Sequence, residues 1–135
     1  KLFLSNLTYN SSMSSFNKNS LYLKLKNLIL DDNKKQKFSK VQQVTFDDFF
    51  KDKKIENSFL KIDVEGYEYN VLIGASKKIK DVKYLLIENQ FSNQYKNNIN
   101  EVKDLITKYE FKLIKNFYYP SLHYKDMLFI NKRYK

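Results

Sequence analysis

One short segment, in which an apolar run stops at two acids and a glycine, constrains the fold of this chain most strongly. Residues 59–64 read Phe-Leu-Lys-Ile-Asp-Val, and Glu65 and Gly66 follow directly. A nearly continuous apolar run of this length is typical of a strand that is buried on both faces of a parallel sheet. Residues 67–75 then repeat apolar side chains at helical spacing, and Gly74 is placed to end that helix. The segment therefore predicts a buried strand, a tight turn and a helix in succession.

The rest of the chain alternates in the same way between strand-like and helix-like patterns. Polar residues predict loops, and residues 21–25 alternate like a strand but also fit a helical face. Strands that alternate with helices are typical of an open α/β sheet. We therefore expect one α/β domain over residues 1–135, with a mixed sheet and flanking helices. The predicted strands span 2–5, 41–46, 84–88, 111–114 and 127–130, the predicted helices 47–51 and 99–110, and the predicted loops 6–20 and 31–39.

Composition excludes several classes of site and of protein. Hydrophobic residues make up 42% of the chain and aromatic residues 16%, which is enough to build a core and argues against disorder. The absence of cysteine excludes disulfides, thiolate metal sites and cysteine nucleophiles, and it suits a cytoplasmic location. No run approaches the roughly 18 apolar residues that a membrane span needs. The first residues do not resemble a signal peptide. We therefore expect a cytoplasmic protein without a membrane span.

The net charge of +10 raises the alternative of a nucleic-acid-binding protein. Arg133 is the only arginine, however, and arginine is the residue whose planar group suits phosphate and base contacts. The lysines are also spread along the chain, whereas a binding arm would cluster them. We therefore do not expect nucleic acid as a partner.

Polar side chains end two of the predicted strands, and they form the candidate site of this chain. Asp63 and Glu65 end the first of these strands, and Glu88 and Asn89 end the next. Ligands bind beyond the carboxyl ends of the strands in open α/β sheets. Asp63 and Glu65 are two residues apart, so they would share one face if the strand continued through Val64. The sequence therefore predicts a ligand site that contains these carboxylates.

Carboxylates at the start of a helix can also stabilise it without any chemical role. We assign Glu68, in the first turn of the predicted helix, to that structural role. Gly66 would let the backbone turn sharply or approach a ligand closely, so we interpret Asp63, Glu65 and Gly66 together as functional. Two carboxylates make an incomplete site for an oxygen-preferring cation, and no metal is predicted. His123, the lone histidine, is interpreted as a partly exposed loop residue before the last strand.

Residues 60–75 resemble the signature of the FkbM-type methyltransferases. They read Leu-Lys-Ile-Asp-Val-Glu-Gly-Tyr-Glu and, after two further residues, Val-Leu-Ile-Gly-Ala. Residues 44–49, Val-Thr-Phe-Asp-Asp-Phe, are similar to a Thr-Leu-Asp-Asp-Phe element of the same family. The resemblance extends to the serine-rich segment around Ser11 and Ser12 and to the later strands at 86–88 and 126–130.

The resemblance implies a Rossmann-like class I methyltransferase fold and an activity that uses S-adenosylmethionine as methyl donor. The acceptor would be a hydroxyl of a sugar or of another small molecule. Asp63 and Glu65 would orient or deprotonate that hydroxyl as catalytic residues. Glu88, Asn89 and Gly66 would contribute to binding the acceptor.

The chain departs from the family pattern in its glycines. The family holds the donor with a glycine-rich loop after the first strand and with an acid that ends the second. Gly66 and Gly74 are the only glycines here, and both belong to the later motif. We therefore expect the C-terminal portion of such a domain, truncated at its N-terminus. A non-catalytic remnant that acts as an interaction module is the alternative, and the sequence does not determine the acceptor or the oligomeric state.

Overall fold

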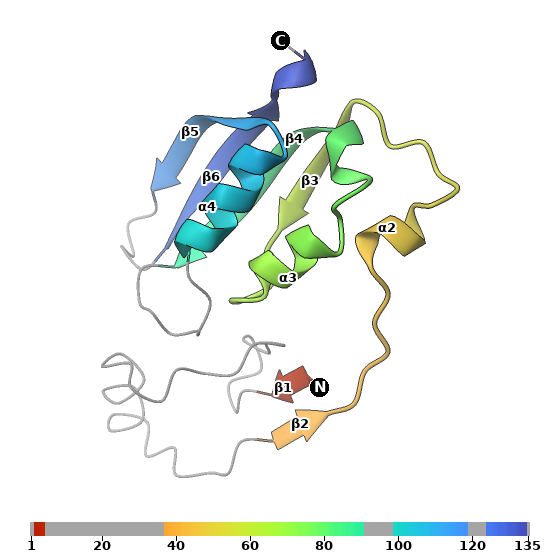
Figure 1. The fold of residues 1–135 in the computed structure, drawn as a ribbon. Coiled ribbons are helices and arrows are strands. Elements are labelled where there is room, and N and C mark those ends of the chain that lie inside the picture. The colour runs from red at the N-terminus through yellow and green to blue at the C-terminus, as the bar shows by residue number, and fades with distance from the viewer. Residues whose placement is uncertain (1, 5–36, 91–98, 119–123, 135) are drawn as a thin grey trace.

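The structure is a computed structural model, which describes residues 2–4, 37–90, 99–118 and 124–134 (Figure 1). The loop predicted at 6–20, the ambiguous segment at 21–25 and His123 lie outside these residues. Two short strands, β1 (Leu2–Leu4) and β2 (Lys37–Ser39), pair antiparallel with Phe3 opposite Phe38. The strand β2 lies in a region whose polar sequence predicted a loop, so that prediction is wrong for its last three residues.

The main sheet has four strands in the order β3-β4-β6-β5. The pair β3–β4 is parallel, and the pairs β4–β6 and β6–β5 are antiparallel. The structure therefore confirms the prediction of a mixed sheet in an α/β protein. The strands are β3 (Ser58–Ile62), β4 (Val82–Gln90), β5 (Phe111–Tyr118) and β6 (Tyr124–Asn131).

Two helices, α3 (Glu68–Ile73) and α4 (Ile99–Lys108), lie over the same face of this sheet (Figure 1). The apolar faces predicted for both helices pack there, since Leu72 of α3 and Ile106 of α4 are both buried. Full burial of such a side chain stabilises the fold by about 1.5–3 kcal/mol. Three shorter helices complete the described part: α2 (Phe46–Phe49), η1 (Ile79–Asp81) and η2 (Lys132–Tyr134). The core comprises Ile62, Leu72, Ala75, Ile79, Val82, Leu85, Ile87, Val102, Ile106, Phe111, Met127 and Phe129.

Strand β3 is buried on one face only, which corrects the sequence prediction. Ile62 is buried, but Phe59 remains 58% exposed and Lys61 is exposed. Successive side chains of a strand point to opposite faces. Lys61 lies beside Leu86 of β4, on the face opposite to the helices. The apolar run therefore marked the strand correctly but overstated how much of it packs into the core.

Residues 41–46 do not form the predicted strand. Residues 41–45 run as irregular backbone with Val41 and Val44 exposed, and Phe46 is the first residue of α2. Thr45 instead begins α2 as its N-cap: its hydroxyl accepts a hydrogen bond of 3.0 Å from the Asp48 N–H. A threonine followed three residues later by an acid is a helix-start pattern, and here it decides the local structure over β-propensity.

Asp47 anchors α2 to the chain that follows α3. Its carboxylate accepts hydrogen bonds from the backbone N–H of Lys77, at 3.0 Å, and of Lys78, at 2.8 Å. Its own N–H donates to the Gly74 carbonyl at 3.0 Å. Gly74 lies close to Thr45, because a methyl group added on Gly74 would be 3.4 Å from Thr45 Cβ. The Thr-x-Asp-Asp pattern therefore has a structural role in this chain.

A buried amide fixes the other end of the sheet. Asn131 is 1% exposed, and its Nδ2 donates to the carbonyls of Lys80, at 2.9 Å, and Val82, at 3.1 Å. Its Oδ1 accepts from the Arg133 N–H at 3.1 Å. These bonds tie the end of β6 to the start of β4 and satisfy backbone carbonyls there, as buried polar groups require.

Candidate functional site

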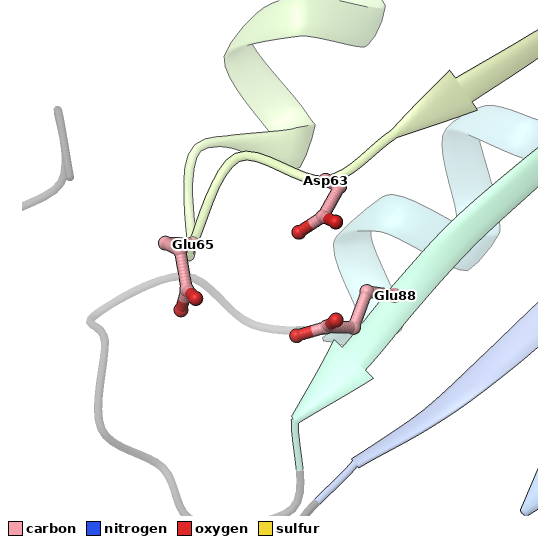
Figure 2. Close-up of side chains that lie close together, drawn as sticks. All are labelled: Asp63, Glu65 and Glu88. Atoms are coloured by element: carbon pink, nitrogen blue, oxygen red, sulfur yellow. The ribbon is translucent and has the colours of Figure 1, made fainter. Parts of the chain in front are cut away.

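The carboxyl ends of the parallel strands β3 and β4 bring the predicted acids together. The register pairs Ile62 with Ile87, so the residues that follow them, Asp63 and Glu88, are neighbours at one edge of the sheet. Glu65 reaches the same place from the turn after β3, and Figure 2 shows the three side chains pointing toward a common space. Asp63, Glu65 and Glu88 each offer a carboxylate oxygen, and these oxygens all lie within 4.8 Å of one another. We call these three residues the acidic set.

Glu65 reaches this position by a different route from the one that the sequence suggested. Strand β3 ends at Ile62, so no strand carries Asp63 and Glu65 on a shared face. The backbone instead turns through left-handed conformations, with φ of 50° at Glu65 and 88° at Gly66. Glycine adopts such a φ without steric cost, whereas a glutamate rarely does. The turn therefore aims the Glu65 side chain toward the sheet edge.

Lys61 is a member of the site that the sequence did not single out. Its Nζ donates a hydrogen bond to Asp63 Oδ2 at 2.8 Å. This bond and the charge of Asp63 raise the pKa of Lys61, and the charges of Asp126 and Glu88 add to the effect, while partial desolvation opposes it. The lysine therefore remains cationic and compensates part of the negative charge at the sheet edge. Its position two residues before Asp63 in the sequence was the signal that could have identified it.

Asp126 extends the negative charge onto the neighbouring antiparallel strand. The register places it directly opposite Glu88, so both side chains lie on one face of the sheet. Asp126 is only 6% exposed, although it is a charged residue. The sequence marked it only as the start of the last strand, because the partner of β4 could not be read from the chain.

Asn89 lies apart from the acidic set. It follows Glu88 within β4, so its side chain projects to the opposite face, and it is 8% exposed there. Gly66 lies in the turn and donates its N–H to Glu68 Oε1 at 2.9 Å. Of the five residues predicted for the site, the structure groups Asp63, Glu65 and Glu88, places Gly66 beside them, and directs Asn89 away.

Three carboxylate oxygens at this spacing can do two kinds of chemistry. They can accept protons or hydrogen bonds from hydroxyl groups of a ligand. They could also coordinate an oxygen-preferring divalent cation, since the structure adds Glu88 to the two carboxylates weighed from the sequence. Exposed acidic groups of this kind are common in proteins without an ion.

Among the helices of the described residues, none is long and apolar enough to cross a membrane.

Comparison with known protein families identifies the chain. The profile of the methyltransferase FkbM domain matches residues 6–113, which is most of the chain. The chain belongs to the FkbM methyltransferase family. The match contains the acidic set, α2 and the strands β3 and β4, so the site lies within this FkbM methyltransferase domain. Searches of curated proteins and of solved structures gave no match.

Proposed function

We propose that this FkbM methyltransferase domain transfers a methyl group from S-adenosylmethionine to a hydroxyl of a sugar or of another small molecule. The observation that supports the proposal most directly is the convergence of Asp63, Glu65 and Glu88 at the carboxyl ends of two parallel strands. This is the place where open α/β sheets bind ligands. The proposal also includes a Rossmann-like fold for the whole domain. The parallel pair β3–β4, connected through α3, is consistent with that fold.

A hydroxyl is a poor nucleophile at neutral pH, so it must lose its proton to an acceptor as it reacts. Asp63 is the best candidate for that acceptor. Lys61 binds its Oδ2 at 2.8 Å and thereby orients the carboxylate within the site. A positioned base of this kind accelerates reactions by about 10²–10⁴-fold. Glu65 and Glu88 would accept hydrogen bonds from further hydroxyls of the acceptor and hold the reacting oxygen in place.

The charge of the site fits a cationic methyl donor. When bound, S-adenosylmethionine supplies a methyl group activated by a positively charged sulfur. Among the described residues, four acids lie at or beside this sheet edge, and Lys61 bonds to one of them; the acids are Asp63, Glu65, Glu88 and Asp126. The site is therefore negative within a chain whose net charge is +10. A cation held at this edge is favoured by Coulomb attraction, which is strongest where water is excluded.

The proposal is tested first by calorimetric titration with S-adenosylmethionine. The titration uses this chain and, where the reading frame extends upstream, the longer chain as well. Radiolabelled methyl transfer is then measured against a panel of sugars and hydroxylated small molecules. We expect binding and a labelled product that survives alkali, because a methyl ether resists hydrolysis whereas a methyl ester does not. Absence of binding and transfer by both chains, or a product that alkali cleaves, would overturn the proposal.

A further inference from the structure

Glu68 is a buried carboxyl group that the proposed chemistry does not use. It is the first residue of α3 and is only 9% exposed. Its place in the sequence indicates an acid that stabilises the start of the helix through capping and the helix dipole. A carboxylate buried to this degree is costly unless its oxygens accept hydrogen bonds. The contacts of Glu68 therefore call for an explanation beyond the helix dipole.

The described contact of Glu68 is with the turn that carries Glu65. Glu68 Oε1 accepts a hydrogen bond of 2.9 Å from the Gly66 N–H. Tyr67, the N-cap of α3, makes no side-chain capping bond, so the helix start is held from Glu68 instead. The bond reaches back across the helix start, as the second half of a capping box does.

The turn needs such support because its backbone is unusual. Glu65 has a φ of 50°, a left-handed conformation that a residue with a Cβ adopts only where its surroundings hold it. Gly66, with a φ of 88°, follows directly and donates to Glu68. A bond to the N–H of Gly66 fixes the peptide group that joins it to Glu65. This peptide group follows Glu65 directly, so the bond to Glu68 lies next to the backbone that directs the Glu65 side chain.

We propose that Glu68 is a positioning residue for the acidic set, because its bond to Gly66 holds Glu65 in the conformation that faces Asp63 and Glu88. The inference deepens the proposed methyl transfer and rests on it for its effect on turnover. Its structural part stands on the hydrogen bond and the backbone conformation alone.

Burial raises the pKa of Glu68, and the negative charges of Glu65 and Asp63 raise it further, while the N–H groups of Glu68 and Gly66 act in the opposite direction. Two carboxylates of the acidic set and two backbone N–H groups therefore act on the Glu68 carboxyl group, so the turn and the acidic set are electrostatically linked. A merely structural acid could be replaced by leucine at this buried position without effect on Glu65.

The test compares three variants. Glu68→Gln keeps an oxygen acceptor at the position of Oε1, and Glu68→Leu removes it at similar volume. Glu101→Leu is the matched control, because Glu101 is an exposed glutamate in the first turn of α4. Circular dichroism establishes that each variant folds. Should Glu68→Leu fail to fold, Glu68→Ala and Glu68→Ser take its place, and Glu68→Gln by itself must retain the wild-type turn.

The first readout is independent of turnover. NMR gives the amide proton shift of Gly66 and the Cα and Cβ shifts of Glu65, which report the hydrogen bond and the left-handed backbone. We expect wild-type values in Glu68→Gln and Glu101→Leu. In Glu68→Leu the Gly66 amide should move upfield and the Glu65 shifts should lose their left-handed signature. Unchanged Glu65 shifts in Glu68→Leu would overturn the inference, whether or not the chain transfers methyl groups.

The second readout is a double-mutant cycle on kcat for methyl transfer. We expect Glu68→Leu to lower kcat at least tenfold, and Glu68→Gln to restore most of that loss. In a Glu65→Gln background the additional change Glu68→Leu should have little further effect, because Glu68 acts through Glu65. If the loss of kcat in the double variant equalled the product of the losses in the two single variants, the inference would be contradicted. Absence of turnover in the wild type would instead count against the proposed function, and the NMR result would decide the position of Glu65 separately.

Discussion

Lys61 donates a hydrogen bond from Nζ to Asp63 Oδ2 at 2.8 Å, and it does so from the sheet face opposite to the helices. This pair links the last exposed residue of a strand to the first acid beyond it. It leaves the other oxygen of Asp63 available for a ligand and sets a cation among four acids. The lysine is within reach of the acid because Lys61 is the last residue but one of β3 and Asp63 is the first residue beyond that strand.

Replacement of Asp63 by asparagine should remove the proposed base with little change in shape. We expect kcat for methyl transfer to fall by about 10²–10⁴-fold, because the amide cannot accept the hydroxyl proton. The thermal unfolding midpoint should remain close to that of the wild type, since Asp63 is exposed. Asp104→Asn, an exposed change on α4, is the control and should leave both quantities unchanged. Undiminished turnover in Asp63→Asn would remove Asp63 from the chemistry.

Replacement of Glu68 by glutamine should change how stability depends on pH. Burial raises the pKa of Glu68 in the folded state above its ordinary value of 4.5. Between that value and the raised pKa the folded state binds more protons than the unfolded state, so the contribution of Glu68 falls as pH increases. The free energy of unfolding of Glu68→Gln, relative to the wild type, should therefore rise with pH between 4.5 and the raised pKa of Glu68. Urea unfolding at a series of pH values measures this difference in free energy. A difference that fell as pH increased would show that folding lowers the pKa of Glu68.

Replacement of Asp47 by alanine should detach α2 from the chain after α3. The backbone N–H groups of Lys77 and Lys78 would lose their carboxylate acceptor, and we expect the free energy of unfolding to fall by about 1–3 kcal/mol. Asp52→Ala is the matched control, because Asp52 lies in an exposed turn with only a long ion-pair distance of 4.0 Å to Lys51. Urea denaturation of both variants measures the two losses in the free energy of unfolding. Equal losses would show that the hydrogen bonds of Asp47 do not stabilise the fold.

Replacement of Asn131 by alanine should be among the more damaging polar substitutions in this chain. It would leave the carbonyls of Lys80 and Val82 without the amide donor and open a small cavity, at a cost of about 2–3 kcal/mol in the free energy of unfolding. Thermal and urea unfolding measure the loss. Asn70→Ala, at an exposed position on α3, should stay within about 0.5 kcal/mol. A similarly small effect for Asn131→Ala would mean that water replaces the amide.

Local patterns of the sequence located most of the regular structure. The helix predicted over 99–110 is α4, and the strand–turn–helix at 59–75 corresponds to β3, the acidic turn and α3. Helical and strand periodicities depend on residues near one another in the chain, so they can be read without the fold. The same reasoning failed at 41–46, where the capping bonds of Thr45 outweigh β-propensity. The strands predicted at 84–88, 111–114 and 127–130 are shorter than β4, β5 and β6. Pairing with neighbouring strands extends these strands beyond the local pattern.

The sequence by itself determined that an acid-bearing strand end exists and that its motif belongs to a methyltransferase family. Only the tertiary structure decided which side chains share that place. Asp126 joins Glu88 because β6 lies beside β4, and Asn89 turns away because its strand alternates. Glu65 reaches the set through a left-handed turn, not through a continued strand. Strand neighbours depend on contacts between distant segments, and no local spacing of residues encodes them.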